Sequence, residues 1–295
     1  MRMLECRANF HQRKLRPKQL LHVDSIQKHM RKLLPLTAIV VLLSTLPAFP
    51  NSVVATRSRL NLRVMTYNIH VGVGMDKKLD LQRIADVINL EHPDLVGLQE
   101  VDRGVKRTEG IDEIAELARL TKMQFAFAHN LDYQGGQYGV AILSRFPILH
   151  VDHRKYENKR EAERRGMLRI EINVRGRKLS FVTTHLDYQY ADGRRFETEQ
   201  LLDFLKDQTE PLVVVGDFNE EPNGEAYKLM WPSFRDAWMD AGHGSAGFTF
   251  PADKPSKRID FILYGTRHLI RIKKTWIPNT LASDHLPVVA DLEVH

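Results

Sequence analysis

The stretch Leu212-Val-Val-Val-Gly-Asp-Phe-Asn219 decides how the rest of this chain is interpreted. Its four apolar residues, three of them β-branched, are typical of a buried strand. The run ends at Gly216, and the polar residues Asp217 and Asn219 follow it directly. A carboxylate and an amide two residues apart can address the same water molecule. The stretch therefore predicts a sheet that carries polar chemistry at its rim.

Other apolar runs in the chain also end in a polar residue. Asn68 follows Val-Met-Thr-Tyr, Glu100 follows Leu-Val-Gly-Leu-Gln, and His185 follows Phe-Val-Thr-Thr. The pattern predicts strands at Leu62–Tyr67, Leu95–Leu98, Tyr138–Leu143, Leu168–Val174, Leu179–Thr183, Leu212–Val215, Ile259–Tyr264 and Pro287–Leu292. Helical spacing links Leu81, Ile84, Ala85 and Ile88, then Ile114, Leu117 and Ala118, and later Leu201, Leu202 and Leu205. No low-complexity linker interrupts residues 60–295, so we expect one α/β domain there.

The first 55 residues differ in composition from the rest. Met30-Arg31-Lys32 precedes an apolar run of about 14 residues, and Val53-Val54-Ala55 follows it. A run this short falls below the roughly 20 residues that span a bilayer, so residues 30–55 are predicted to be a signal peptide cleaved after Ala55. We therefore expect a periplasmic or secreted protein with no stable membrane span after cleavage; an uncleaved anchor is the alternative. Residues 1–29 precede a complete signal, which indicates that translation starts at Met30.

The leader also accounts for the basic character of the chain. Residues 1–55 carry nine Lys or Arg side chains against Glu5 and Asp24, and the remainder carries 34 basic and 35 acidic side chains. The net charge of +6 therefore becomes −1 after cleavage. Neutralising many DNA phosphates requires additional Lys and Arg, so the overall charge argues against duplex DNA as the substrate. Cys6 is the only cysteine, and the mature chain is expected to have no disulfide and no thiolate metal site.

The polar residues near the predicted strand ends favour a hard metal ion. They comprise carboxylates, amides and imidazoles at Glu100, Asp217, Asp260, Asp284, Asn68, Asn219, His185 and His285. Oxygen ligands suit Mg²⁺ or Mn²⁺, and Mg²⁺ needs only one or two carboxylates besides water and a substrate phosphate. The two histidines lack the spacing of a zinc motif, so zinc is disfavoured.

These residues could together hydrolyse a phosphoester. That reaction needs a metal, a group that activates water, and donors around the phosphoryl oxygens. Asp217 could accept a proton from water that Asn219 orients, and Asp284 could bind the metal beside an imidazolium at His285 held by Asp260. Each residue alone could instead form a turn or occupy the core; the joint occurrence beside predicted strands favours the functional interpretation.

Seven segments carry a resemblance to a known family. They are Met65-Thr-Tyr-Asn68-Ile, Leu98-Gln-Glu100-Val-Asp102-Arg103, Tyr138-Gly-Val-Ala-Ile-Leu-Ser144-Arg145, Thr184-His185-Leu-Asp187, Gly216-Asp217-Phe-Asn219, Arg258-Ile-Asp260 and Ser283-Asp284-His285. As a set they resemble the endonuclease/exonuclease/phosphatase superfamily over about Leu62 to Leu292. The resemblance implies a four-layer α/β sandwich in which two mixed β-sheets pack face to face and helices flank them.

The resemblance also implies roles for individual residues. Glu100 would be the principal metal ligand, with Asn68 nearby and Asp284 on the metal side. Asp217 and Asn219 would act on the attacking water, and His285 with Asp260 on the phosphate. His185 would contact the phosphate or the leaving group, and the Tyr138 phenol would approach the phosphoryl oxygens. The residues expected to bind substrate are Arg103, Asn219, His185 and Arg258.

The superfamily resemblance leaves the substrate open. Its members include nucleases, deadenylases, inositol-polyphosphate 5-phosphatases and sphingomyelinases, and the Thr-His-Leu-Asp segment is more similar to the deadenylase and lipid-phosphodiesterase members. We expect a phosphodiesterase or phosphatase acting on a lipid headgroup, a nucleotide or a small molecule. A secreted nuclease that degrades DNA or RNA and a non-catalytic binding module on the same fold are the alternatives. No sequence feature indicates an oligomeric state.

Two further groups of residues have two interpretations each. The basic run between Arg154 and Arg169 could bind an anionic headgroup or polynucleotide, but such runs are usually solvated loops. Aromatic residues near the motifs could hold a base or acyl chain, although packing is the commoner role. They are Tyr133, Tyr188, Tyr190, Phe248 and Trp276.

Overall fold

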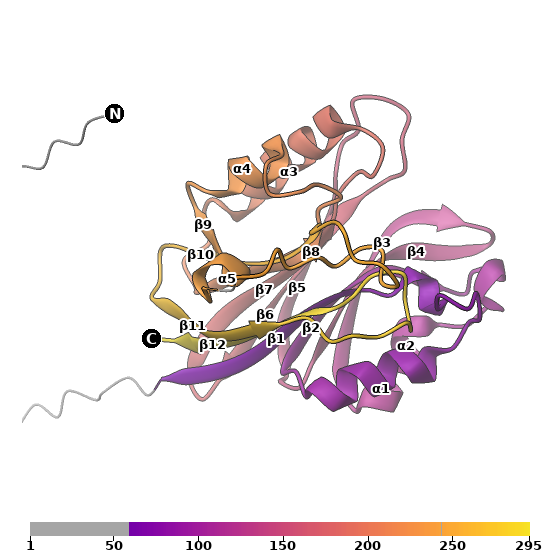
Figure 1. Ribbon diagram of the computed structural model, residues 1–295, viewed down its shortest axis with the longest axis horizontal. Helices are drawn as coiled ribbons and strands as arrows, with labels where there is room; N and C mark the ends of the chain where they lie inside the picture. Colours follow the sequence, from indigo (N-terminus) through magenta and orange to yellow (C-terminus); the bar gives the residue numbers. More distant parts are fainter. Residues whose placement is uncertain (1–58, 243) are drawn as a thin grey trace, which may run out of the picture. The chain divides into compact units, whose positions relative to one another are not determined.

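The computed structural model describes residues 59–242 and 244–295 (Figure 1). The predicted start at Met30 and the predicted signal peptide lie outside these residues. The strands are β1 (Leu60–Asn68), β2 (Leu95–Arg103), β3 (Gln124–Tyr133), β4 (Gly136–Ser144), β5 (Ile148–Lys155), β6 (Gly166–Val174), β7 (Arg177–His185), β8 (Leu212–Asp217), β9 (Phe234–Asp236), β10 (Asp260–Gly265), β11 (Ile270–Trp276) and β12 (Val288–Val294). The helices are α1 (Leu81–Glu91), α2 (Glu113–Thr121), α3 (Ala191–Leu205), α4 (Glu225–Met230) and α5 (Ala237–Asp240), with 3₁₀ turns η1 (His70–Gly72) and η2 (Lys106–Thr108).

The strands form two six-stranded mixed sheets. The first has the order β11-β12-β1-β2-β4-β3, and the second has the order β5-β6-β7-β8-β10-β9. Each sheet has one parallel pair at its centre, β1 with β2 and β7 with β8, and all other pairs are antiparallel. The carboxyl ends of parallel neighbours lie at the same edge of a sheet. Each sheet therefore brings two strand ends together at its middle.

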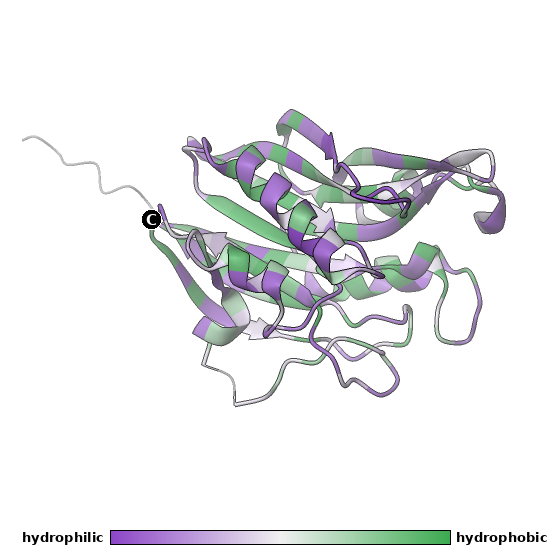
Figure 2. Ribbon diagram, turned by 90° about the horizontal axis from the view of Figure 1, so that it is seen from above, coloured by the Kyte–Doolittle hydropathy of each residue, from purple (hydrophilic) through white to green (hydrophobic). Residues whose placement is uncertain are grey.

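Three apolar clusters hold the layers together. One fills the space between the sheets, a second packs α1 and α2 onto the first sheet, and a third packs α3 and α4 onto the second. Helices α1 to α4 lie on the outer faces of the sheets in Figure 1, whereas Ala237 and Trp238 of α5 pack into the cluster between the sheets. Green and purple alternate along the outer helices in Figure 2, as expected of amphipathic helices. This arrangement confirms the predicted four-layer α/β sandwich. None of the helices in the described residues has the length and apolar character needed to cross a membrane.

The strands that the sequence did not predict are the outer ones. β11 and β3 border the first sheet, and β5 and β9 border the second. Edge strands lack a partner on one side and often carry charged residues that block further pairing. The sequence His150-Val-Asp-His-Arg-Lys155 in β5 shows this composition, and it masks the apolar alternation by which inner strands are recognised.

The two sheets approach closely where β2 crosses β7 and β8. A Cβ atom at Gly97 would lie 2.3 Å from Val215 Cγ2 and 2.8 Å from Thr183 Oγ1. Two residues further along β2, Gln99 Nε2 donates to Thr183 Oγ1 at 2.8 Å, a hydrogen bond between the sheets. Gly97 therefore allows an approach that any side chain would prevent.

We predict that Gly97→Val destabilises the fold by about 1–3 kcal/mol, because the added methyl groups overpack the space between the sheets. Thermal unfolding of the purified variant should show a midpoint several degrees lower. Gly265→Ala is the matched control, since its Cβ would meet Leu212 Cβ at an ordinary 3.5 Å. An unchanged midpoint in Gly97→Val would contradict the proposed close approach.

Candidate functional site

Polar residues from both sheets meet at one edge of the sandwich. Asn68 ends β1, and Glu100 lies near the end of β2. In the second sheet, His185 ends β7 directly opposite Asp217 at the end of β8, and Asp217 also pairs with Asp260 at the start of β10. The central parallel pairs therefore deliver these side chains to a common place.

The Asn68 side chain joins the two sheets. Its Nδ2 donates to Glu100 Oε1 at 2.9 Å in the first sheet and to Asp217 Oδ2 at 3.0 Å in the second. Its Oδ1 accepts from the His70 backbone N–H at 3.0 Å, and its carbonyl accepts from Ser283 Oγ at 2.7 Å. Asn68 is fully buried and held on every polar atom. It therefore fixes the separation of two carboxylates that would otherwise repel each other.

Glu100 occupies a distorted part of β2. The register between β2 and β4 shifts between Leu98 and Val101, and Glu100 has a φ of 56°. Few residues other than glycine adopt such a left-handed conformation, and bulges of this kind commonly redirect side chains at functional sites. Glu100 lines the pocket described below.

A second group combines two carboxylates with an imidazole. His285 Nδ1 lies 3.0 Å from Asp260 Oδ2, and His285 Nε2 lies 3.7 Å from Asp217 Oδ2. Burial lowers the pKa of His285, but the two carboxylates outweigh it and raise that pKa to about 10. Burial, followed by the neighbouring Asp260, raises the pKa of Asp217 to about 7. His285 is therefore an imidazolium at neutral pH.

Asn219 connects Asp217 with His185. The Asn219 backbone N–H donates to Asp217 Oδ1 at 2.8 Å, and its Nδ2 donates to the Leu186 carbonyl at 3.0 Å. The same Nδ2 lies 2.9 Å from His185 Nε2. Asn219 has a φ of 49°, which turns the chain back toward the end of β7.

These groups border a pocket of about 430 Å³. Its lining residues are His70, Glu100, Arg107, Leu131, Tyr133, Tyr138, Glu163, Arg165, His185, Tyr188, Asp217, Asn219, Phe250, Asp284 and His285. Asn68 and Asp260 do not line the pocket; they hydrogen-bond to residues that do. The structure therefore brings together every residue predicted to bind the metal or to take part in the chemistry.

Two arginines predicted to bind substrate lie elsewhere. Arg258 is buried and donates to Asp236 Oδ2 at 2.7 Å, with its guanidinium 4.9 Å from the Phe261 ring centre. Arg103 donates to Asp112 Oδ2 at 2.6 Å. Neither lines the pocket. The geometry corrects this expectation, because both guanidinium groups are committed to carboxylates that anchor neighbouring helices, α5 and α2.

The profile of the endonuclease/exonuclease/phosphatase family matches residues 65–285. The chain belongs to this family. The match spans all the motifs from Asn68 to His285 that meet at the pocket.

Two relatives show how far the family likeness extends. YbhP of Escherichia coli (strain K12) is 27% identical over 255 residues, which cover 80% of this chain and 98% of YbhP. The crystal structure of an endonuclease/exonuclease/phosphatase from Beutenbergia cavernae DSM 12333 is 26% identical, with a TM-score of 0.69 over 79% of this chain and 72% of that chain.

A mannosyl-6-phosphatase from Bacteroides thetaiotaomicron has the same fold at 16% identity. Its TM-score is 0.66 over 78% of this chain and 99% of that chain. Family membership makes the present chain a hydrolase of the phosphoesterase type. The family generally uses divalent metals, and ligand atoms of Asp217, Asp260 and His285 lie within 4.8 Å of one another, a spacing that could hold an ion.

Arg165 is one of several pocket residues that the sequence did not single out, and it has the most contacts with predicted site residues. Its side chain is 4% exposed, and Nη1 lies 2.6 Å from His185 Nδ1, 3.3 Å from the Tyr138 hydroxyl and 3.1 Å from Glu163 Oε1. Arginine only donates hydrogen bonds, so the Arg165 contact favours a ring proton on Nε2, 3.5 Å from Asp217 Oδ2. The Asn219 amide, a donor 2.9 Å from Nε2, favours the other tautomer, and we expect the charged donor to prevail. Burial and then Arg165 hold the pKa of His185 well below its usual range, so the ring is neutral.

The basic run that contains Arg165 does not form one surface. Arg169 is buried and pairs with Asp152, Arg160 pairs with Asp192, and Lys159 lies 4.6 Å from the Phe196 ring centre. Arg164 donates to the Tyr156 carbonyl at 2.9 Å. The one sequence feature that distinguishes Arg165 from these neighbours is the glycine that follows it. A Cβ added at Gly166 would lie 2.5 Å from the Arg154 carbonyl oxygen. That crowding fixes the backbone next to Arg165.

We predict that Arg165→Met switches the tautomer of His185. Without the charged donor at Nδ1, the Asn219 amide at Nε2 becomes the stronger partner, and the ring proton should move to Nδ1. Nitrogen-15 NMR of histidine-labelled protein measures the tautomer, with a His185→Gln spectrum to assign the signals. Arg164→Met, one residue away and outside the pocket, should leave the signals unchanged. An Nε2–H tautomer retained in Arg165→Met would refute this assignment.

Proposed function

We propose that this chain is a Mg²⁺-dependent phosphoesterase that acts outside the cytoplasm and directs water onto the phosphorus of a small phosphate ester; Mn²⁺ would also suit the site. The observation that carries the proposal is the Asn68 amide, which holds Glu100 and Asp217 on either side of it. One carboxylate is thereby available to a metal and the other to a water molecule. The supporting residues of both lie around the same pocket.

Glu100 and Asp284 fit a hard cation, and the Asn68 amide, which is predicted to lie near the metal, holds Glu100 in place from behind the pocket. Only Oε1 of Glu100 hydrogen-bonds to Asn68, which leaves Oε2 available, and the Asp284 side chain is 26% exposed at the pocket. Carboxylate and amide oxygens are the donors that Mg²⁺ prefers. When bound, Mg²⁺ would supply positive charge that offsets the charge developing on the phosphoryl oxygens.

The cluster of Asp217, Asp260 and His285 is less suited to the ion. A ligating histidine must be neutral. The two carboxylates raise the pKa of His285 to about 10, so a cation there would first have to displace a tightly held proton. We therefore assign this cluster to proton and charge stabilisation rather than to metal binding.

Asp217 is suited to accept the proton of the attacking water. A general base works best when its pKa lies near the working pH, and burial raises the pKa of Asp217 to about 7. The Asn219 backbone N–H holds the Asp217 Oδ1 atom at 2.8 Å, and its side-chain amide borders the same pocket. Asn219 would thereby orient the water.

The remaining residues would stabilise the phosphoryl group. The His285 imidazolium, held by Asp260, presents Nε2 toward the pocket and would donate to a phosphoryl oxygen. His185 and Tyr138 approach from the opposite side, where Arg165 orients both. A pure binding module would need no buried carboxylate poised for proton transfer, so this set favours catalysis.

We predict that two substitutions separate the metal from the base. Glu100→Gln should raise the Mg²⁺ concentration needed for half-maximal activity, because it removes a ligand charge. Asp217→Asn should lower kcat by about 10²–10⁴-fold at saturating Mg²⁺. Initial rates are measured on a panel of aryl phosphomonoester and phosphodiester, sphingomyelin, inositol phosphates and single- and double-stranded nucleic acid, with Mg²⁺ and with chelator.

The exposed Asp203→Asn serves as control and should match the wild type. Activity that persists in chelator would overturn metal dependence. If Asp260→Asn, and not Glu100→Gln, shifts the Mg²⁺ requirement, the metal belongs to the Asp217, Asp260 and His285 cluster instead. Fastest turnover of nucleic acid would favour the nuclease alternative.

We predict that the exported protein begins at Thr56, because the leader ends in a Val-Val-Ala sequence suited to signal peptidase. Cell fractionation followed by mass spectrometry of the N-terminal peptide measures this. Replacing Leu42-Leu43 by two aspartates should interrupt the apolar run and retain the precursor in the cytoplasm. A full-length chain beginning at Met1 in the cytoplasmic fraction would contradict export.

A further inference from the structure

The pocket has a second half that phosphate hydrolysis alone does not require. Leu131, Tyr133, Tyr188 and Phe250 line it beside the reacting groups, and we call these four residues the apolar wall. Tyr133 ends β3 of the first sheet, whereas Tyr188 follows β7 of the second. The wall is therefore built from both sheets around one pocket.

Two tyrosines of the apolar wall are exposed and yet held in place. Tyr188 is 54% exposed and Tyr133 is 40% exposed. The Arg165 guanidinium lies 5.8 Å from the Tyr188 ring centre, and the Arg107 guanidinium lies 4.7 Å from that of Tyr133. Contacts of this kind hold an aromatic ring at low entropic cost. Each ring is thus a pre-oriented apolar surface at the pocket.

The charges of the pocket leave little capacity for a second anionic group. Arg107 and Arg165 are the Lys or Arg side chains that line it among the described residues. Arg107 makes two hydrogen bonds to Asp102, at 2.7 and 2.9 Å, and Arg165 pairs with Glu163 at 3.1 Å. Nearby, Arg160 is bound to Asp192. A polyphosphorylated substrate would need unpaired cations at this position.

We infer that the pocket selects phosphate esters whose organic group is an uncharged ring, such as a sugar, nucleoside or aryl group, which stacks on Tyr188 and Tyr133. This rests on the proposed phosphoesterase function and names its substrate class. Stacking on tyrosine tolerates different rings, since every such ring offers an apolar face. Polyphosphorylated alcohols are excluded as preferred substrates, because the wall offers them no free cation.

The test compares esters that share a leaving group. Thymidine 5′-(methyl phosphate) and ethyl methyl phosphate share methanol as leaving group and differ only in whether the second alcohol carries a ring system, and thymidine 5′-monophosphate and glycerol 3-phosphate form the monoester pair. We expect Tyr188→Leu to lower kcat/KM for the ring-bearing ester by about 10-fold or more and to leave the acyclic ester within about twofold. Tyr188→Phe should retain the wild-type preference.

Tyr190→Leu is the matched control. Tyr190 also lies on an arginine, 4.4 Å from the Arg160 guanidinium, but does not line the pocket. Its substitution should change neither ester. Equal losses for both esters in Tyr188→Leu would overturn the inference. So would an inositol trisphosphate, whose ring carries further phosphates, if the wild type hydrolysed it faster than every ester of an uncharged ring. The kcat/KM values for aryl, nucleoside and sugar phosphates then show which kind of ring the pocket prefers.

A binding measurement separates this inference from the proposed function. In chelator, calorimetry should show that the wild type binds thymidine 5′-monophosphate at least about 10-fold more tightly than glycerol 3-phosphate, and that Tyr188→Leu loses this difference. If no ester is hydrolysed but the binding preference depends on Tyr188, the function fails and the ring preference stands. If esters are hydrolysed but thymidine 5′-monophosphate is not bound more tightly than glycerol 3-phosphate, the proposed function stands and the ring preference fails.

Discussion

The Asn68 amide is the interaction on which the site depends. Two carboxylates placed on facing sheets would repel each other and would be costly to bury. One amide nitrogen has two hydrogens, and Asn68 gives one to Glu100 and the other to Asp217. The contact gives each acid a hydrogen bond from the same neutral amide, in addition to the His285 imidazolium that lies 3.7 Å from Asp217 Oδ2. It therefore joins the two sheets at the edge where hydrolysis requires a ligand and a base side by side.

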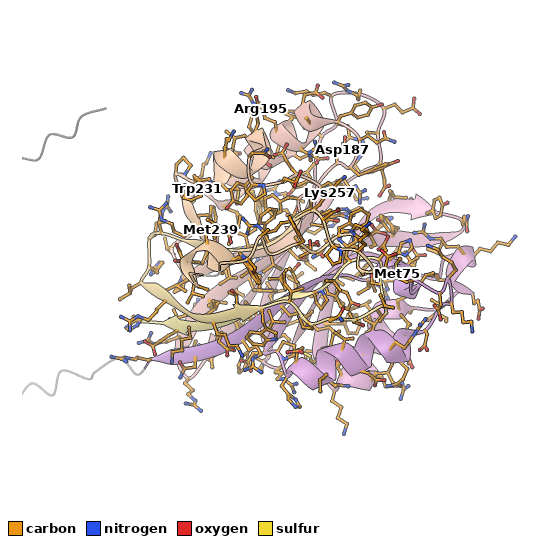
Figure 3. All side chains as sticks on the ribbon, in the orientation of Figure 1. Met75, Asp187, Arg195, Trp231, Met239 and Lys257 are labelled. Atoms are coloured by element: carbon orange, nitrogen blue, oxygen red, sulfur yellow. The ribbon has the colours of Figure 1, made fainter. Side chains whose placement is uncertain are left out.

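The topology explains why this contact forms there. Each sheet has its only parallel pair at the centre, so the carboxyl ends of β1 and β2 face those of β7 and β8. The segments beyond these ends are supported in matching ways: Glu113 of α2 accepts the Asp102 backbone N–H, and Glu197 of α3 accepts the Asp187 backbone N–H, each at 2.7 Å. In each sheet, a buried carboxyl group of a covering helix therefore fixes the backbone next to a central strand end. The outer faces of the helices, where Arg195 of α3 lies in Figure 3, take no part in the site.

Sequence reasoning found the parts of the fold whose pattern is local. Inner strands show apolar runs, and their polar ends at Asn68, His185 and Asp217 predicted the rim at which those residues meet. The edge strand β5 and Arg165 were not predicted because both lie in polar, charged sequence, and only tertiary pairing gives them structure. Arg258 was expected at the substrate because it lies two residues before Asp260, but its guanidinium donates to Asp236, a tertiary contact that the sequence does not reveal.

The side chains that line the pocket are held in place in two different ways. The reacting side uses buried polar groups with several polar contacts each, as at His185, where Arg165 lies against one ring nitrogen and Asn219 against the other. Such groups are costly to bury and are useful only when geometry must be exact to a fraction of an ångström. The apolar wall uses exposed rings resting on guanidinium groups, which constrain direction and tolerate different partners. In such a site the buried network sets the chemistry, and exposed residues such as Tyr188, whose ring lies over Arg165 of that network, set the substrate range.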